Sequence, residues 1–466
     1  MSSNADRVSP ETPSSSKNAA NELLIESRGR YVLAGKTVSA KQLSDQDTHL
    51  ASACETKLIW QGRSGQPSIE RMPDRRIQAR INQWERDRVT ASHSRRDLLT
   101  GDWTIFAPER DQRPNDYAIL EARCAESEHR TVHGVDPDCP FCRGAESETP
   151  KAVWSAKRSD ELTCRADDDR TRLARPAVEV RPSDQPDWDI RVVPNKFPAV
   201  SPFDTAGAIP QQQSSFFPVT DTVGGHEVMI ESSEHAELIT QLDASFLYMT
   251  LLAYRDRIRH WRQVPGIEYI SVFKNCGPDA GASLRHSHSQ LIATSLMPQR
   301  VRTVTERCQN YRARTGCALG CDLLRAELNE RTRVIDHADS FVAFCPFASR
   351  FPGLVRVTST MHQPHFDDFS DNALDNLASF LWRVLGWVDT AFPGKAYNYL
   401  LHTCPPGIKQ PDAFHWSLDV FPRLSKTAGF EWSSDCMINS MLPEDATDRY
   451  REAAFANDPR HVLAIH

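Results

Sequence analysis

The stretch that most constrains the fold reads FKNCGPDAGASLRHSHSQ, from Phe273 to Gln290. It predicts a strand that runs into a Gly-rich loop and then into a second strand. Because side chains alternate between the two faces of a strand, His286, His288 and Gln290 are expected on one face. Three polar side chains on one face of an otherwise apolar strand are costly unless they are paired or used. The stretch therefore predicts a strand with a chemical role.

The loop before this strand has the composition of an anion site. Gly277, Gly281 and Ser283 would let backbone N–H groups approach a phosphate closely. Imidazole is a good nucleophile near neutral pH, and its attack on phosphorus gives a reactive phosphoramidate. A phosphate beside two imidazoles is the simplest interpretation. The alternative is a satisfied polar pair or a pair of plain metal ligands, which is the commoner role of an isolated His-x-His, and the flanking residues weaken it.

Apolar spacing on either side of this stretch predicts an α+β fold with an antiparallel sheet. A Thr-Gly-Asp turn at 100–102 leads into a β-rich run, and a helix is expected over 244–261. Further strands are expected at 190–193, 226–231, 267–273 and 286–293. A second set of strands is expected at 340–344, 354–359, 397–402 and 414–421, with a helix over 372–388. The order of this second set resembles the first, which suggests an internal duplication.

Bulk composition limits the class of protein. A chain of 466 residues is long enough for two to three domains. No stretch approaches the roughly 18 apolar residues that would span a bilayer, so no membrane partner is expected. The polar N-terminus lacks the apolar core of a secretory signal, which makes a cytoplasmic location the expectation. A formal net charge of −7 argues against a nucleic-acid partner, because duplex binding needs a basic face.

The first 95 residues differ in composition from the remainder. Residues 1 to about 20 are rich in Ser, Asn and Pro, so they cannot bury enough apolar surface to offset the entropy of ordering. The segment that follows is strongly charged and fits a mobile arm with one helix. We therefore expect an N-terminal extension that is partly disordered.

Cysteine spacing indicates a metal site. The pair Cys139-Pro140-Phe141-Cys142 has the spacing at which two thiolates reach one tetrahedral zinc. In a cytosolic chain such a pair is more often a metal site than a disulfide. The alternative is two buried free thiols. Two further ligands are needed, and the candidates are His226, His235, His286 and the pair Cys317/Cys321.

Two arginines form a candidate phosphate clamp. Arg110 and Arg113 lie in the run APERDQRP, and guanidinium offers fixed, forked donors to phosphate oxygens. By spacing alone, a solvated basic turn is the better interpretation.

Taken together, the motifs from about Arg96 to about residue 455 occur in the order found in one family. The chain resembles the galactose-1-phosphate uridylyltransferases of the histidine-triad superfamily and their relatives the ADP-glucose phosphorylases. The resemblance implies an α+β fold of two histidine-triad-like halves, each an antiparallel sheet with packed helices, after an N-terminal extension. The implied boundaries are 1–95 for the extension, 96–300 for the catalytic half and 301–466 for the second half.

The resemblance implies a role for each ligand and for the nucleophile. The family's pattern is His-Pro-His-x-Gln, and this chain has His-Ser-His-Ser-Gln, which makes His288 the nucleophile. The segment ending at Ser232-Ser233-Glu234-His235 resembles the one that delivers the third metal ligand, so His235 is preferred over His226. The implied zinc ligands are Cys139, Cys142, His235 and His286. Four protein ligands leave no open position for water, so this zinc is expected to be structural.

The resemblance also implies the residues that contact the substrate. Gln290 is expected to donate to the phosphoryl oxygens. The other implied contacts are Arg110 and Arg113 as phosphate clamps, Asn195 and Phe197 against base or ribose, Asn275 and Ser283 as phosphate contacts, and Asn439.

The implied reaction is a two-step exchange. His288 attacks the α-phosphorus of a nucleotide sugar, glucose 1-phosphate leaves, and a second phosphate then attacks the nucleotidyl-histidine. The preferred donor is UDP-glucose with a hexose 1-phosphate such as galactose 1-phosphate as acceptor. The alternative is adenylyl transfer between ADP-glucose and phosphate. Hydrolysis is disfavoured because the smaller histidine-triad hydrolases carry a third histidine where this chain has Gln290. Members are often dimers, so a homodimer is possible.

A non-enzymatic alternative is a zinc-stabilised binding protein. In that case Cys139, Cys142, Cys317 and Cys321 would form an all-thiolate site, and His286 would be dispensable for metal binding.

A second metal, which some members hold with a carboxylate and three histidines, is doubtful in this chain. Two of those histidines form a His-x-His pair, and here the pair reads His415-Trp416-Ser417. Only His402, His415 and Glu306 remain as candidates. The segment from His415 to Asn439 is more similar to the ADP-glucose phosphorylases.

Overall fold

The computed structural model describes residues 92–108, 110, 134–163, 175–181, 187–203, 216, 219–338 and 340–457, and three short strands before residue 40. The chain divides into two compact units, Met1–Trp84 and Glu85–His466. In the first unit, an antiparallel sheet is formed by β1 (Leu24–Glu26), β2 (Arg30–Leu33) and β3 (Lys36–Val38). The sequence predicted no strand there. The expected disorder, and the expected helix of the arm, lie outside the described residues.

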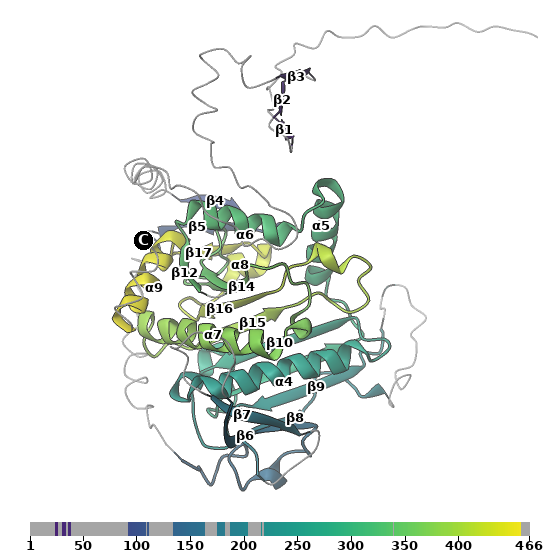
Figure 1. Cartoon of the computed structure of the whole chain (residues 1–466), viewed down its shortest axis with the longest axis vertical. Coiled ribbons are helices and arrows are strands. Elements are labelled where there is room, and N and C mark those ends of the chain that lie inside the picture. The colour runs from purple at the N-terminus through teal and green to yellow at the C-terminus, as the bar shows by residue number, and fades with distance from the viewer. Residues whose placement is uncertain are drawn as a thin grey trace, which may run out of the picture. The chain divides into compact units, whose positions relative to one another are not determined.

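The second unit is organised around one antiparallel sheet of eleven described strands (Figure 1). The first set of strands is β6 (Trp154–Thr163), β7 (Arg175–Arg181), β8 (Ile190–Pro194), β9 (Gly224–Ile230), β10 (Tyr269–Cys276) and β11 (His288–Thr294). The second set is β12 (Val334–Ala338), β13 (Phe341–Phe344), β14 (Val355–Ser359), β15 (Tyr397–His402) and β16 (Ser417–Pro422). Their order across the sheet is β12-β13-β14-β16-β15-β10-β11-β9-β8-β6-β7.

The two sets repeat one topology. Along the chain, β8-β9-helix-β10-β11 is followed by β13-β14-helix-β15-β16. Across the sheet, the first set runs β10-β11-β9-β8 outward from the centre, and the second runs β15-β16-β14-β13. This order supports the suspected duplication and confirms the α+β fold with antiparallel strands. The sets meet where β10 pairs with β15, with Val272 opposite Leu401, so they share one continuous sheet. The proposed boundary near residue 300 stays a prediction.

Two long helices cover one face of this sheet and pack against each other: α4 (Ala244–Arg262) and α7 (Asp371–Ala391) (Figure 1). The side chains of Asp243 and Ser370 cap their first turns by accepting hydrogen bonds from backbone N–H groups. Buried α7 residues recur at helical spacing, as in Leu374, Leu377 and Leu381. One hydrophobic core contains side chains of both helices and of both sets of strands.

The remaining elements lie outside this sheet. A small sheet is formed by β4 (His93–Arg96), β5 (Trp103–Phe106) and β17 (Met437–Asn439), in which β17 runs parallel to β5. The other α-helices of the described residues are α5 (Gln299–Thr315), α6 (Leu319–Glu330), α8 (Gly429–Ser434) and α9 (Pro443–Asn457). Short 3-10 turns occur at Glu146–Glu148, Ile239–Gln241, Pro278–Ala280, Phe366–Asp368 and Pro411–Ala413. No helix among the described residues has the length and apolar character needed to cross a membrane.

Candidate functional site

The candidate site lies on the face of the sheet opposite α4. Leu291 and Ala293 of β11 belong to the core with that helix, so alternation turns His288 and Gln290 toward the other face.

The loop before β11 requires glycine at position 277. Gly277 has φ 84°, and a Cβ there would lie 2.8 Å from the Cβ of Ala396. The predicted strand–loop–strand is thus present, although β11 begins at His288 and not at His286.

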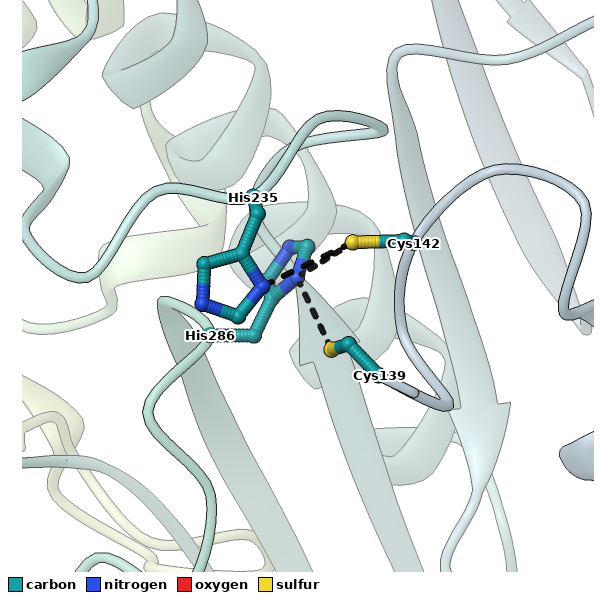
Figure 2. Close-up of side chains that lie close together, drawn as sticks. All are labelled: Cys139, Cys142, His235 and His286. Carbon is teal, nitrogen blue, oxygen red and sulfur yellow. Dashed lines mark hydrogen bonds between the residues drawn. The ribbon is translucent and has the colours of Figure 1, made fainter. Parts of the chain in front are cut away.

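Four buried side chains converge beside the start of β11 (Figure 2). The ligand atoms of Cys139, Cys142, His235 and His286 all lie within 4.8 Å of one another. The Sγ atoms of Cys139 and Cys142 lie 3.4 and 3.6 Å from Nδ1 of His286, and Nδ1 of His235 lies 3.6 Å from Cys142 Sγ. Two thiolates and two imidazoles are the donor set of a tetrahedral structural metal site. This group could hold a metal ion.

The hydrogen bonds and burial of the group agree with that role. Nε2 of His286 donates to the Ser232 carbonyl at 3.0 Å, which leaves Nδ1 with its lone pair toward the thiols. Burial raises the pKa of the Cys142 thiol to about 11 and lowers that of His286 to about 4. Without a cation, both groups are therefore neutral at physiological pH. Binding a metal would displace the thiol proton, as is usual for such sites.

His288 has a defined tautomer. Its Nδ1 lies 2.7 Å from the backbone carbonyl of His286. Because a carbonyl oxygen only accepts, Nδ1 carries the hydrogen, and in a neutral ring Nε2 keeps a lone pair. Burial lowers the pKa of His288, despite the opposing hydrogen bond to His286, so the ring is neutral near pH 7. Nε2 is the atom that can act as a nucleophile.

The ring of Phe141 joins the metal-binding group to His288. Phe141 lies between the two cysteines in the sequence, and its ring contacts His286 and His288 edge-on, with centroids 6.0 and 5.4 Å apart. A displacement of the loop that carries the cysteines would therefore disturb the His288 ring. The sequence analysis gave Phe141 no role.

A buried ion pair lies on the helix side of the sheet, behind His288. Lys274 of β10 donates to the Glu231 carboxylate, to Ser287 Oγ at 2.9 Å and to the His288 carbonyl at 3.1 Å. Lys274 and Glu231 are 1% and 0% exposed. Ser287 Oγ also donates to Glu231 at 2.7 Å. Ser287, which stands where the resembled His-Pro-His pattern has proline, is therefore part of a buried network that the sequence did not indicate.

His226, considered from the sequence only as a possible metal ligand, lies between Gln290 and Asn195. Both of these residues are expected to contact the substrate. His226 Nε2 lies 2.8 Å from Gln290 Oε1 and 3.2 Å from Asn195 Nδ2. His235, and not His226, belongs to the metal-binding group. The three polar side chains gather where β9 and β11 lie next to the segment after β8.

For the other residues expected to contact substrate, the structure shows exposure or hydrogen bonds that do not test the expected role. Phe197 is 82% exposed, Arg110 and Ser283 are also exposed, and Arg113 lies outside the described residues. Asn275 accepts at 2.9 Å from Asn398 Nδ2, which also donates to the Ala280 carbonyl of the Gly-rich loop. The roles of these five expected residues stay predictions.

Asn439, also expected at the substrate, lies in the interior of the protein. Its side chain is 0% exposed. Nδ2 donates to the Ser349 carbonyl at 2.9 Å, and Oδ1 accepts from the backbone N–H of Met441 at 2.9 Å. Both ends of the amide are thus used inside the protein at the end of β17. A role of Asn439 at the substrate stays a prediction.

A second group of possible metal ligands occurs in the later half of the chain. Cys321 Sγ lies 3.2 Å from His362 Nδ1 and 3.7 Å from His415 Nδ1, and these three residues could hold a metal ion. A second metal was doubted from the sequence because Ser417 stands where the His-x-His pair would have its second histidine, and neither Cys321 nor His362 was considered for such a site. His402 lies beside Asp419, whose carboxylate is already held at 2.7 Å by two nitrogens of Arg356.

These two groups bear on the all-thiolate alternative. Cys139 and Cys142 lie with two histidines, and Cys321 lies with two different histidines. The described residues therefore contain no group of four cysteines, and the alternative that made His286 dispensable has no structural support.

The chain is similar in sequence and in structure to known proteins. A family model described as a domain of unknown function, DUF4921, matches residues 223–464. ADP-glucose phosphorylase from Arabidopsis thaliana is 30% identical over 77% of this chain and 92% of its own length. Galactose-1-phosphate uridylyltransferase from Thermotoga maritima is 24% identical over 57% of this chain and 85% of its own. A crystal structure of the Arabidopsis phosphorylase with bound ADP-glucose superimposes with a TM-score of 0.61 and 30% identity, over 78% of this chain and 99% of that one.

Proposed function

Because this chain belongs to the galactose-1-phosphate uridylyltransferase family, in the branch that includes the ADP-glucose phosphorylases, we propose that it transfers AMP from ADP-glucose to phosphate through His288. The observation that carries the proposal is the His288 tautomer, which keeps the Nε2 lone pair available beside a Gly-rich loop. An imidazole in this state attacks phosphorus without first losing a proton.

The reaction proceeds in two balanced steps. In the first, Nε2 bonds to the α-phosphorus of ADP-glucose, the bond to the bridging oxygen breaks, and glucose 1-phosphate leaves. In the second, a phosphate oxygen attacks the same phosphorus, the phosphorus–nitrogen bond breaks, and ADP is released. The charge that develops on the phosphoryl oxygens would be stabilised by hydrogen-bond donors. The proposed donors are the Gln290 amide, the backbone of the Gly277–Ser283 loop, and the guanidinium groups of Arg110 and Arg113.

The choice of adenylyl transfer rests on the relatives. The Arabidopsis relative named ADP-glucose phosphorylase matches at 30% identity over 92% of its length, and its crystal structure contains ADP-glucose. The sequence analysis preferred UDP-glucose with a hexose 1-phosphate acceptor. That reaction remains the second candidate, because the Thermotoga uridylyltransferase matches over 85% of its length. Both reactions use the same histidine chemistry and differ in the pockets for base and acceptor.

Labelling of His288 tests the function and separates the two donors. The protein is incubated with ADP-glucose or with UDP-glucose, and its intact mass is measured. We expect the added mass of AMP with ADP-glucose, its loss when phosphate is added, and no label on the His288→Ala variant. Labelling by UMP alone, discharged by galactose 1-phosphate, would support the second candidate. If neither nucleotide labels the protein, both proposals fail.

We further propose that the group formed by Cys139, Cys142, His235 and His286 holds a structural zinc ion. When bound, zinc would cross-link the loop of the two cysteines to the residues before β11. The His286 carbonyl accepts the Nδ1 hydrogen of His288. Fixing the His286 backbone therefore fixes the hydrogen bond that selects the reactive tautomer.

Removing one ligand tests this assignment. We expect His286→Ala to weaken zinc binding at this group by at least about tenfold. Loss of a residue that only hydrogen-bonds to a metal ligand already weakens binding by about that factor. Bound zinc is measured by elemental analysis after dialysis against a competing chelator. The matched control is His415→Ala, which alters the second group and leaves this one intact. Full zinc retention by both variants would contradict the assignment.

Two further expectations from the sequence stay predictions, the homodimer and the cytoplasmic location.

A further inference from the structure

His226 is a half-buried residue that lies between two side chains of the proposed site, Gln290 and Asn195. It lies on β9, which pairs with β11 so that His226 is opposite Ile292 and Val228 is opposite Gln290. Its two ring nitrogens have different partners. Nδ1 lies 3.1 Å from the backbone nitrogen of Ala199, and Nε2 lies 2.8 Å from Gln290 Oε1.

The partner of Nδ1 fixes the tautomer of His226. A backbone N–H can only donate, so Nδ1 must accept from Ala199 and cannot carry a hydrogen. Burial lowers the pKa of His226, against an opposing hydrogen bond to Gln290, so the ring is neutral near pH 7. A neutral ring with no hydrogen on Nδ1 has its hydrogen on Nε2.

The hydrogen on Nε2 in turn fixes the amide of Gln290. Because Nε2 donates, its partner at 2.8 Å must be the amide oxygen and not the amide nitrogen. The amide nitrogen of Gln290 is then the end of the side chain that faces away from His226. If the Gln290 amide were turned around, its oxygen would point toward the phosphate, and the partial negative charge of that oxygen would repel the anion.

The Asn195 amide does not compete for this hydrogen bond. Its Oδ1 accepts from the backbone N–H of Phe197 at 2.8 Å, which fixes its nitrogen toward His226 at 3.2 Å. Since Nε2 already carries a hydrogen, that nitrogen cannot donate to it. His226 therefore donates only to Gln290.

We propose that His226 is a positioning residue that holds the Gln290 amide nitrogen toward the phosphoryl oxygens during nucleotidyl transfer to His288. The inference rests on the proposed function and deepens it. His288 and Gln290 project from the same face of β11, two residues apart, so a phosphoryl group on His288 lies within reach of the Gln290 side chain. A donor that meets developing charge acts on kcat more than on binding.

Two substitutions at His226 separate positioning from simple packing. His226→Asn keeps an oxygen near the position of Nδ1 and has no atom that reaches Gln290. His226→Gln places an amide nitrogen near the position of Nε2, so it can restore the donor. We expect His226→Asn to lower kcat about 10- to 100-fold, the range for partners behind a functional group, with KM changed less than about threefold. His226→Gln should recover most of kcat. The control, His260→Asn on the exposed end of α4, should leave kcat unchanged.

A double-mutant cycle with Gln290→Ala gives the decisive measurement. If His226 acts through Gln290, adding His226→Asn to Gln290→Ala should lower kcat no further. An equal loss in both backgrounds, or an unchanged kcat for His226→Asn alone, would overturn the proposal. A loss caused by misfolding would persist in the Gln290→Ala background, so it counts as overturning. Failure of the proposed function is distinguishable, because the unaltered protein would then transfer neither nucleotide.

Discussion

Replacing His288 is expected to remove nucleotidyl transfer almost completely. We expect His288→Asn to lower kcat by about 10⁴-fold or more, the size of loss seen when a covalent nucleophile is deleted. Asparagine can still donate to the His286 carbonyl from near the position of Nδ1, but it has no atom in the position of Nε2. The measurement is steady-state turnover of ADP-glucose and of UDP-glucose, together with the melting temperature of each variant.

The control for this prediction is His337→Ala. His337 is an exposed histidine of β12, and its removal should leave kcat within about twofold. A His288→Asn variant that keeps more than about one hundredth of wild-type kcat would show that another group carries the transfer.

The second large effect is expected on stability, at the buried ion pair of Lys274 and Glu231 behind β11. Lys274→Met would leave the Glu231 carboxylate, which is 0% exposed, without its charged partner. Burial alone would raise the pKa of Glu231, and the charge and hydrogen bond of Lys274 hold it below its usual range. We expect the free energy of unfolding to fall by about 3 to 5 kcal/mol, as when one partner of a buried pair is removed. Denaturation in urea at neutral pH measures it.

Two further variants make this prediction specific. Arg300→Met breaks the partly exposed ion pair with Asp102 and should cost no more than about 1 kcal/mol. The double variant Lys274→Met/Glu231→Leu removes both charges and should regain part of the loss, because no unpaired carboxylate remains buried. A double variant as unstable as Lys274→Met would mean that packing, and not the unpaired charge, explains the loss.

Sequence patterns predicted the fold where they were local and amphipathic. The helices at 244–261 and 372–388 were expected, and the structure contains α4 and α7 there. By contrast, α5 and α6 were not predicted. The polar helix α5 buries only Thr305 and Cys308, so it lacks the apolar stripe that identifies a helix. The joining of the two sets of strands at β10 and β15 also has no local signal, because the paired residues lie more than a hundred positions apart in the chain.

For the site too, local sequence patterns were informative and contacts between distant residues were not. The short spacing of Cys139 and Cys142 predicted half of a metal-binding group, and the family resemblance supplied His235 and His286. The sequence indicated no role for Lys274 or Glu231, and for His226 only that of a possible metal ligand. A single polar residue in or beside a strand has the same appearance whether it faces solvent or a distant partner. The internal hydrogen bonds of Asn439 were not predicted for a related reason, since an amide suits a substrate and the backbone equally well. Such roles become visible only when the partner is known.

Every described strand of the large sheet is hydrogen-bonded to its neighbour, and this restricts how the protein can move. Enzymes built from two lobes commonly open and close about a flexible joint between them. Here β10, the neighbour of the strand that carries His288, is also the strand that pairs with β15 of the second set. Across the described strands there is no seam along which two lobes could separate without breaking main-chain hydrogen bonds. If His288 is the nucleophile as proposed, we expect substrate entry and product release to depend on the loops at the surface of the sheet, while β11 stays fixed in position.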